Sequence, residues 1–303
     1  MADQQEADAI RFLQDAAPKR RYTVLVPDEG LSESNKRKSL AAYISETWHY
    51  RNFIYEHAKF KASADNDDMF LGRLWNLLEP LLRIAMYGLM FGLVLRTSRG
   101  VDNFVGFLII GLTYFSMMSR GLGSGSGLVQ RSKAMMRTFR FPRVSLVVGE
   151  AIRGFISNLI PGLLAVVAAL AFQWGTWPKW TIILIIPIYF LIHIFSFGLL
   201  LISARVTAFL PDAKKVVFFV NRAWFYVSGV FFSVERYARI PEVQQVMQAN
   251  PAYQFLQAAR GVVMYGQCPN AMEWLTLVLW SVGTAVVGFI FFWRAEDRYV
   301  HVR

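Results

Sequence analysis

The first candidates for chemistry are ionisable side chains inside long apolar segments, because a proton relay or ion site within a membrane needs such groups. The sequence offers four of them: Glu150, Arg153, His193 and Arg222. Glu150 and Arg153 are three residues apart and are expected to pair on one helix face. Arg222 lies close enough to the start of its apolar segment to reach the membrane surface. His193 stands alone, which favours a packing role. Ion coupling is therefore not predicted.

An alternating glycine run at Gly121, Gly123, Gly125 and Gly127 resembles a phosphate cradle in composition. A P-loop needs Lys and then Ser or Thr after its last glycine, whereas Leu and Val follow here. We expect the run to serve close helix packing or a hinge. No Walker, HExxH or GxSxG motif occurs in the sequence, so we predict neither an enzyme nor a cofactor site in this chain. The single Cys268 excludes an intrachain disulfide and a cysteine-rich metal site.

A basic segment from Leu128 to Glu150 separates two apolar blocks. Its cations precede the first acid, Glu150, and are Arg131, Lys133, Arg137, Arg140 and Arg143. Short loops of this kind stay on the cytoplasmic face of a membrane, because cationic residues resist translocation. That rule explains the charges but not the large apolar residues between them, which are Met135, Met136, Phe139 and Phe141. A loop with both kinds of side chain is expected to dock into another molecule; the alternative is a topology signal whose apolar residues lie on the membrane.

Composition places these segments in a membrane. The chain has 303 residues, of which 55% are hydrophobic, and its apolar residues come in long blocks. The net charge of +11 is concentrated at the ends of those blocks, which favours membrane topology over nucleic-acid binding. No cleavable signal peptide is predicted, because the first residues are polar.

The order of the blocks predicts an all-α membrane protein with six transmembrane helices, an N-terminal amphipathic interfacial helix and an amphipathic external region that does not span the membrane. We divide the chain into a polar cytoplasmic extension (1–38), the interfacial helix (39–62) and the transmembrane domain (71–303). The expected spans are Pro80–Leu95, Phe104–Gly127, Val144–Trp174, Thr181–Ala204, Val216–Ser233 and Trp274–Trp293. The loops are a basic loop at 128–143, a second cytoplasmic loop at 205–215 and an external region at 235–272. Basic residues predominate on the side of the termini, so both termini are predicted to be cytoplasmic, in the plasma (inner) membrane.

Several of these segments resemble one family. Residues 71–95 (LGRLWNLLEPLLRIAMYGLMFGLVL), the glycine-rich end of the second span, Phe141-Pro142-Arg143 and Asn250-Pro251 look like successive motifs of type-2 ABC exporter permeases for polysaccharides, O-antigen and teichoic acids. The resemblance covers roughly residues 40–303. Two features depart from it: an acidic stretch replaces the family's basic run before Leu71, and the extension before residue 40 is longer.

The resemblance implies a homodimer that pairs with two copies of a separate ABC ATPase, which would carry the ATP and Mg²⁺. It implies that the permease moves a lipid-linked glycan across the membrane and that the basic loop is the ATPase-coupling element. It also implies that the external region at 235–272 forms short external re-entrant or gate helices. The expected coupling residues are Arg131, Lys133, Met135, Met136, Arg137, Phe139 and Arg140. An exporter of lipids or drugs, or an ion-coupled flippase without an ATPase, remains the alternative.

We also expect aromatic side chains of the first and fifth spans to line the substrate channel, because sugar C–H faces pack on aromatic rings. These residues are Tyr87, Phe91, Trp224, Tyr226, Phe231 and Phe232. The competing interpretation is that they face lipid or pack against one another.

Overall fold

The computed structural model describes residues 39–64, 75–87, 89–90, 103–139, 141–173, 177–232 and 241–301. The predicted extension at 1–38, part of the first predicted span with Phe91, the side chain of Tyr87, and Arg140 lie outside the described residues. All regular secondary structure in the described ranges is helical, which confirms the all-α prediction. The elements are α2 (Leu40–His49), α3 (Arg51–Ala64), α4 (Trp75–Tyr87), α5 (Phe104–Gly125), α6 (Leu128–Arg131), α7 (Lys133–Thr138), α8 (Val144–Ala171), η3 (Trp180–Leu184), α9 (Ile185–Phe209), α10 (Ala213–Val227), α11 (Pro241–Ala249), α12 (Pro251–Arg260), η5 (Gly261–Tyr265), α13 (Ala271–Trp293) and η6 (Glu296–His301).

Within the described residues, four helical segments are long and apolar enough to cross a membrane. They are Phe104–Gly125, Val144–Ala171, Trp180–Phe209 and Ala271–Trp293. They agree with the second, third, fourth and sixth predicted spans. The segments predicted as spans one and five correspond to the shorter helices α4 and α10.

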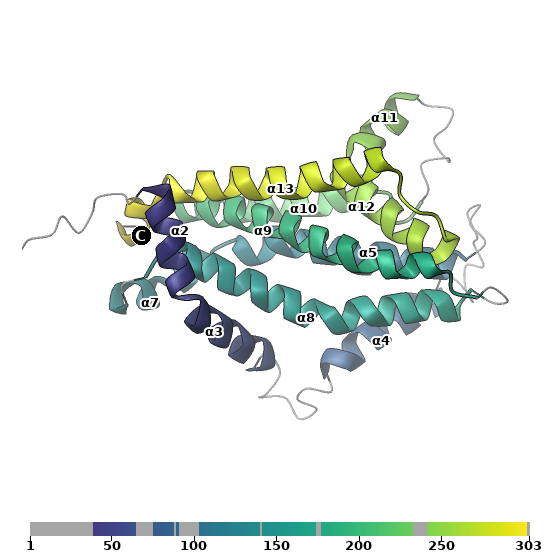
Figure 1. The fold of residues 1–303 in the computed structure, drawn as a ribbon, viewed down its shortest axis with the longest axis horizontal. Coiled ribbons are helices and arrows are strands. Elements are labelled where there is room, and N and C mark those ends of the chain that lie inside the picture. The colour runs from purple at the N-terminus through teal and green to yellow at the C-terminus, as the bar shows by residue number, and fades with distance from the viewer. Residues whose placement is uncertain are drawn as a thin grey trace, which may run out of the picture. The chain divides into compact units, whose positions relative to one another are not determined.

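The long helix α9 occupies the centre of the bundle and makes its most extensive contacts with α13 and α5 (Figure 1). Glycines allow the backbones to approach closely. A Cβ added to Gly121 would lie 2.1 Å from the carbonyl oxygen of Ser196, and one added to Gly125 would lie 2.5 Å from that of Leu200. Gly123 has no such neighbour, because it lies on the opposite face of the same helix. Of the two roles predicted for the run, close helix packing or a hinge, the structure shows close packing at Gly121 and Gly125.

A second glycine contact joins α9 to α13. A Cβ on Gly288 would lie 2.6 Å from the backbone oxygen of Gly198. We expect Gly288→Val to lower the stability of the purified protein by about 1–3 kcal/mol or more, because rigid backbone blocks the new side chain. Gly283→Val, on the same helix but with nothing within 4 Å, is the matched control and should leave the melting temperature unchanged. Equal melting temperatures for both variants would contradict this account of the helix contact.

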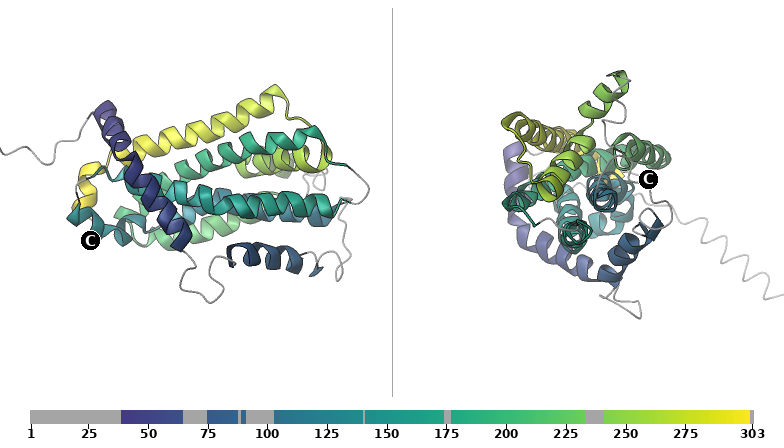
Figure 2. Two further views of the ribbon diagram at one scale, coloured as in Figure 1. Left: turned by 60° about the horizontal axis from the view of Figure 1, so that its bottom comes forward. Right: turned by 90° about the vertical axis from the view of Figure 1, so that its right-hand side faces the viewer.

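At one end of the bundle, α2 and α3 run obliquely across the other helices, close to the C-terminal residues (Figure 2, left). Ser39 caps α2 by accepting a hydrogen bond from the Ala42 amide, as its position predicts. The predicted single helix at 39–62 is broken at Tyr50. Tyr43 and Ile54 are buried, and α3 packs on α8. Trp48 is 68% exposed, which suits a helix at a membrane surface.

Two predicted boundaries differ from the structure. The second basic loop, expected at 205–215, is shorter, because α9 continues through Arg205 to Phe209 and α10 begins at Ala213. A proline first interrupts the sequence at Pro211, so nothing stops α9 earlier. The fifth predicted span, Val216–Ser233, ends as a helix at Val227 and continues as a turn through Gly229, whose φ of 64° lies in the left-handed region.

Candidate functional site

The basic loop follows α5, which ends at Gly125, and the turn into α6 contains Gly127, which adopts a left-handed conformation (φ 75°). The backbone amide of Gly127 donates to the hydroxyl of Thr207 on α9. The guanidinium of Arg131 turns back and donates to the carbonyl oxygens of Ser126 (2.8 Å) and Ser124 (2.9 Å). The loop is therefore attached to the ends of both α5 and α9.

The predicted coupling side chains divide into buried and exposed groups. Met136 is 7% exposed and packs in a cluster formed by residues of α2, α8, α9, α13 and η6, and half-buried Met135 lies against the same cluster. Phe139 is 61% exposed, and Arg137 is also exposed. Lys133 is half-buried. Met136 thus packs α7 against its own chain, and Phe139 is the large apolar side chain that the described part of this loop exposes.

A buried hydrogen-bond network holds the C-terminal end of the basic loop, at Arg143. The Glu296 carboxylate, 6% exposed, accepts from the Tyr43 hydroxyl (2.6 Å) and from the Arg143 backbone amide (2.9 Å), and it forms an ion pair with the Arg143 guanidinium (3.3 Å). The Val144 amide donates to the Tyr43 oxygen (3.1 Å). The network joins α2, the start of α8 and η6, which are far apart in the sequence.

Burial raises the pKa of Glu296 above the usual range for a carboxyl, although the donors from Arg143 and Tyr43 oppose this shift. The Glu296 carboxyl therefore binds its proton more tightly in the folded protein than in the unfolded chain. The contribution of Glu296 protonation to the free energy of unfolding falls as the pH rises from the ordinary carboxyl pKa toward the raised pKa of the folded protein. Removing the carboxylate would also leave buried donors without an acceptor.

We expect Glu296→Gln to destabilise the protein by about 1–3 kcal/mol and to remove this part of the pH dependence. Because α2 would lose a buried attachment, trypsin should also release the N-terminal segment faster. Asp297→Asn, one residue along the chain, is the matched control and should leave melting temperature and digestion unchanged. Wild-type digestion rates in both variants would show that the network does not hold α2.

A groove lies between α5 and α10, with a cavity of about 390 Å³. One helix supplies hydroxyl groups from Ser116 and Ser119, and the other supplies aromatic rings and polar side chains. The lining residues on α10 are Phe218, Asn221, Arg222, Phe225 and Tyr226. The side-chain oxygen of Asn221 is buried and has no hydrogen-bond partner among the described residues. The groove thus combines aromatic faces with uncharged hydrogen-bonding groups and one cation.

The predicted channel residues fall in different places. Tyr226 lines the groove and is 51% exposed. Trp224 lies on the other side of α10: its ring packs edge-on against Phe115, and its indole donates to the Asn250 side chain (2.9 Å). The separation of two residues, about 200° around a helix, explains the difference. Phe231 and Phe232 are half-buried in the turn after α10. The competing interpretation, packing within the protein, thus applies to Trp224.

Two polar residues fasten α12 to the end of α10. Asn250 caps α12 by accepting from the Ala252 amide and also donates to the Ser228 hydroxyl (3.2 Å). Arg260 is fully buried and donates to the carbonyl oxygens of Phe107 (3.2 Å), Gly229 (3.0 Å) and Val230 (3.0 Å). The role of Asn250 could be predicted from the sequence, because Pro251 follows it. The role of Arg260 could not, because its hydrogen-bond partners are distant in the sequence.

Three of the four ionisable candidates within the apolar segments have local partners, whereas Arg222 is exposed and lines the α5–α10 groove. Glu150 and Arg153 form the predicted ion pair (2.9 Å). The two ring nitrogens of His193 lie 2.8 Å from the Tyr189 carbonyl oxygen and 3.2 Å from the Asn158 amide nitrogen. The expected packing role of His193 fits this environment.

Comparisons with known proteins give a consistent result. Residues 66–264 match the family model described as ABC-2 type transporter. The chain is 23% identical over 257 residues to the O-antigen export system permease protein RfbA of Myxococcus xanthus, covering 84% of this chain and 94% of that protein. It is 23% identical over 236 residues to a protein of the same name from Klebsiella pneumoniae, covering 77% of this chain and 87% of the relative.

Proposed function

The chain belongs to the ABC-2 type transporter family, and we propose that it is the membrane subunit of an ATP-driven exporter of a lipid-linked polysaccharide. The observation that carries the proposal is the alignment with O-antigen export permeases over nearly their whole length. The groove between α5 and α10 supports it, because aromatic faces and uncharged polar groups suit a neutral sugar chain.

A second copy of the chain would complete the path. None of the residues of α10 is fully buried, and Phe218, Phe219 and Val220 are exposed. A helix with so much exposed apolar surface is expected to meet another apolar surface. We therefore propose a homodimer in which the α5–α10 grooves of two copies face a shared channel, with α4 and α10 as the remaining two of six spans.

Energy would enter from a separate ATPase subunit, two copies per dimer, which would hold ATP and Mg²⁺. The sequence of this chain contains no Walker motif. The basic loop is the proposed contact, with exposed Phe139 in a cleft of the ATPase and Arg131, Lys133, Arg137 and Arg140 facing acidic residues around it. The network around Glu296 would keep the interfacial helices and the loop together during the motion.

The proposed orientation puts both termini in the cytoplasm and the loop before α13, which contains Cys268, outside the inner membrane. Cys268 is exposed and is the only cysteine of the chain. We expect a membrane-impermeant maleimide to label it in cells whose inner membrane is intact. A Ser39→Cys change in a Cys268→Ser background is the matched control and should be labelled only after that membrane is permeabilised. The opposite pattern would reverse the orientation.

Depletion of the protein tests the export function itself. We expect a lipid-linked glycan to accumulate on the inner side of the membrane while the corresponding polysaccharide disappears from the cell surface, and re-expression should reverse both changes. Unchanged glycan pools would contradict the proposal and favour an exporter of lipids or drugs.

A further inference from the structure

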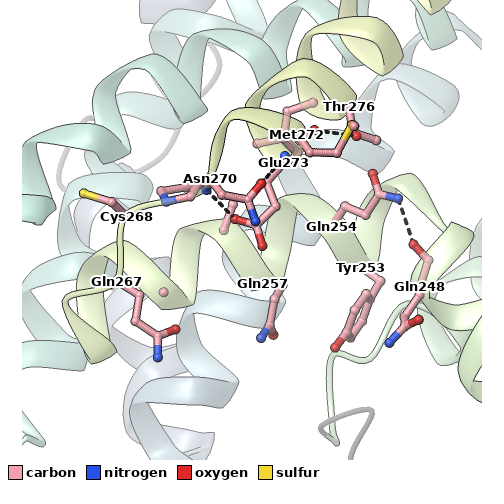
Figure 3. A pocket seen from close by; sticks show the side chains of 14 residues that line it. Gln248, Tyr253, Gln254, Gln257, Gln267, Cys268, Asn270, Met272, Glu273 and Thr276 are labelled. Carbon is pink, nitrogen blue, oxygen red and sulfur yellow. Dashed lines mark hydrogen bonds between the residues drawn. The ribbon is translucent and has the colours of Figure 1, made fainter.

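A cavity of about 650 Å³ lies between α11, α12 and the start of α13 and shares no lining residue with the α5–α10 groove. This volume falls in the range of about 300–1,000 Å³ that small-molecule sites occupy. Its wall is rich in side-chain amides: Gln248, Gln254, Gln257, Gln267 and Asn270 all line it (Figure 3). In that view the side chains of Gln267, Gln257 and Gln248 project toward the same side.

Hydrogen-bonding capacity in the cavity is left unused. Among the described residues, the side-chain amides of Gln257 and Gln267 form no hydrogen bond with the protein, and both residues are exposed. The amide nitrogen of Gln254 donates to the Gln248 carbonyl oxygen (2.7 Å), which leaves the Gln254 oxygen as a buried acceptor without a described donor. Each amide offers both donors and an acceptor, the combination that matches neighbouring hydroxyl groups.

The frame of the cavity is fixed before any ligand arrives. Gly266 adopts a left-handed conformation (φ 65°), and the Gln267 backbone amide donates to the Gly261 carbonyl oxygen (2.9 Å). Asn270 and Glu273 cap α13 reciprocally, at 2.8 and 2.9 Å. A wall held by backbone and cap hydrogen bonds loses little conformational freedom on binding.

The described lining of the cavity contains no cationic side chain, which favours a neutral ligand over an acidic one. No Lys or Arg lines it, and Glu273 is the acid in its wall. A phosphate or an acidic sugar would meet no cation there, whereas a neutral sugar could exchange hydrogen bonds with the amides. Tyr253, which also lines the cavity, adds an aromatic side chain.

We propose that this amide-lined cavity is a binding site for neutral sugar residues of the exported polysaccharide, engaged as the chain leaves the membrane. The proposal rests on the proposed export function and assigns a second contact to the same substrate. The exposed side-chain amides of Gln257 and Gln267 bind sugar hydroxyls.

Cys268 provides a reporter, because it lines the cavity and is the only cysteine of the chain. The rate at which a maleimide modifies Cys268 is measured on the full-length protein in lipid nanodiscs. The probe is the water-soluble polysaccharide released by mild acid from the surface of wild-type host cells. We expect this polysaccharide to slow the modification several-fold in a saturable manner, and polygalacturonate, an acidic polymer, to leave the rate unchanged.

The double variant Gln257→Ala/Gln267→Ala should lose this protection. Gln245→Ala, an exposed glutamine of α11 that does not line the cavity, is the matched control and should keep it. An unchanged labelling rate with the polysaccharide, or protection that persists in the double variant, overturns the proposal. Melting temperatures of the variants show whether each is folded.

The depletion experiment scores export separately. If depleted cells accumulate the lipid-linked glycan while the polysaccharide has no effect on Cys268 labelling, the cavity proposal fails and the export proposal stands. If no glycan accumulates, the export proposal fails whatever the labelling rate.

Discussion

Replacing Arg260 by Met is expected to destabilise the protein by about 3–5 kcal/mol, because several buried backbone carbonyl oxygens lose a donor. The guanidinium is fully buried, donates to three carbonyl oxygens and lies with its central carbon 3.3 Å from the centre of the Phe107 ring. Methionine fills a similar space but donates nothing. Each buried acceptor left without a donor costs about 1–3 kcal/mol.

The consequence should extend beyond stability. Gly229 and Val230 follow the C-terminal end of α10, where backbone carbonyls lack partners within the helix. Arg260 therefore joins α12 to the end of the helix that lines the groove. Arg260→Lys should not restore the wild-type protein, because an ammonium group lacks the planar fork of donors.

Thermal unfolding of the purified protein measures this effect, and the melting temperature is expected to fall by roughly 6–20 °C from the scaling known for domains of 150–250 residues. Arg131→Met is the matched control. Arg131 also donates to two backbone carbonyl oxygens, but it is exposed, so water replaces it and the expected change is below about 1 kcal/mol. A melting temperature for Arg260→Met equal to that of this control would contradict the assigned role.

Replacing Phe139 by Ser should weaken binding of the ATPase subunit by about 2 kcal/mol or more, roughly 30-fold in affinity, as for an aromatic residue at the centre of an interface. The side chain is 61% exposed, so the permease itself should keep its melting temperature. Co-purification of the ATPase and ATP hydrolysis by the assembled complex are the measurements.

Two comparisons isolate this effect. Phe172→Ser changes an exposed phenylalanine at the C-terminal end of α8, the end far from the basic loop. This change should leave ATPase binding intact. Met136→Ser should instead lower the stability of the permease, because Met136 is buried in its own chain. Full retention of the ATPase by Phe139→Ser would show that the loop is not held through this ring.

The predictions on Phe139 and Arg260 concern opposite ends of one set of packed helices. The basic loop is attached to α5 and α9 through Gly127 and Thr207, and α5 forms one wall of the groove. At the other end, Arg260 and Asn250 attach α12 to α10, the second wall. The packed helices thus form a continuous connection between the basic loop and both walls of the groove.

The sequence alone determined the features that depend on local composition. Apolar blocks of about 20 residues identify spanning helices, and the position of basic residues predicts their orientation. The capping role of Ser39, the helix break at Asn250-Pro251 and the pairing of Glu150 with Arg153 follow from neighbours within four residues. The glycine run lacks the Lys that a phosphate site requires, which left helix packing or a hinge as its expected role.

The tertiary structure alone decided which face of each helix meets which neighbour. Met136 and Phe139 look equivalent in the sequence, yet α7 packs so that the first is buried and the second exposed. Trp224 and Tyr226 are two residues apart, yet only Tyr226 lines the groove. Glu296 and Tyr43, 253 positions apart, and Arg260 with its carbonyl partners meet only after the helices have packed. Hydropathy and charge act along the chain, whereas these contacts depend on helix rotation, which the whole bundle sets.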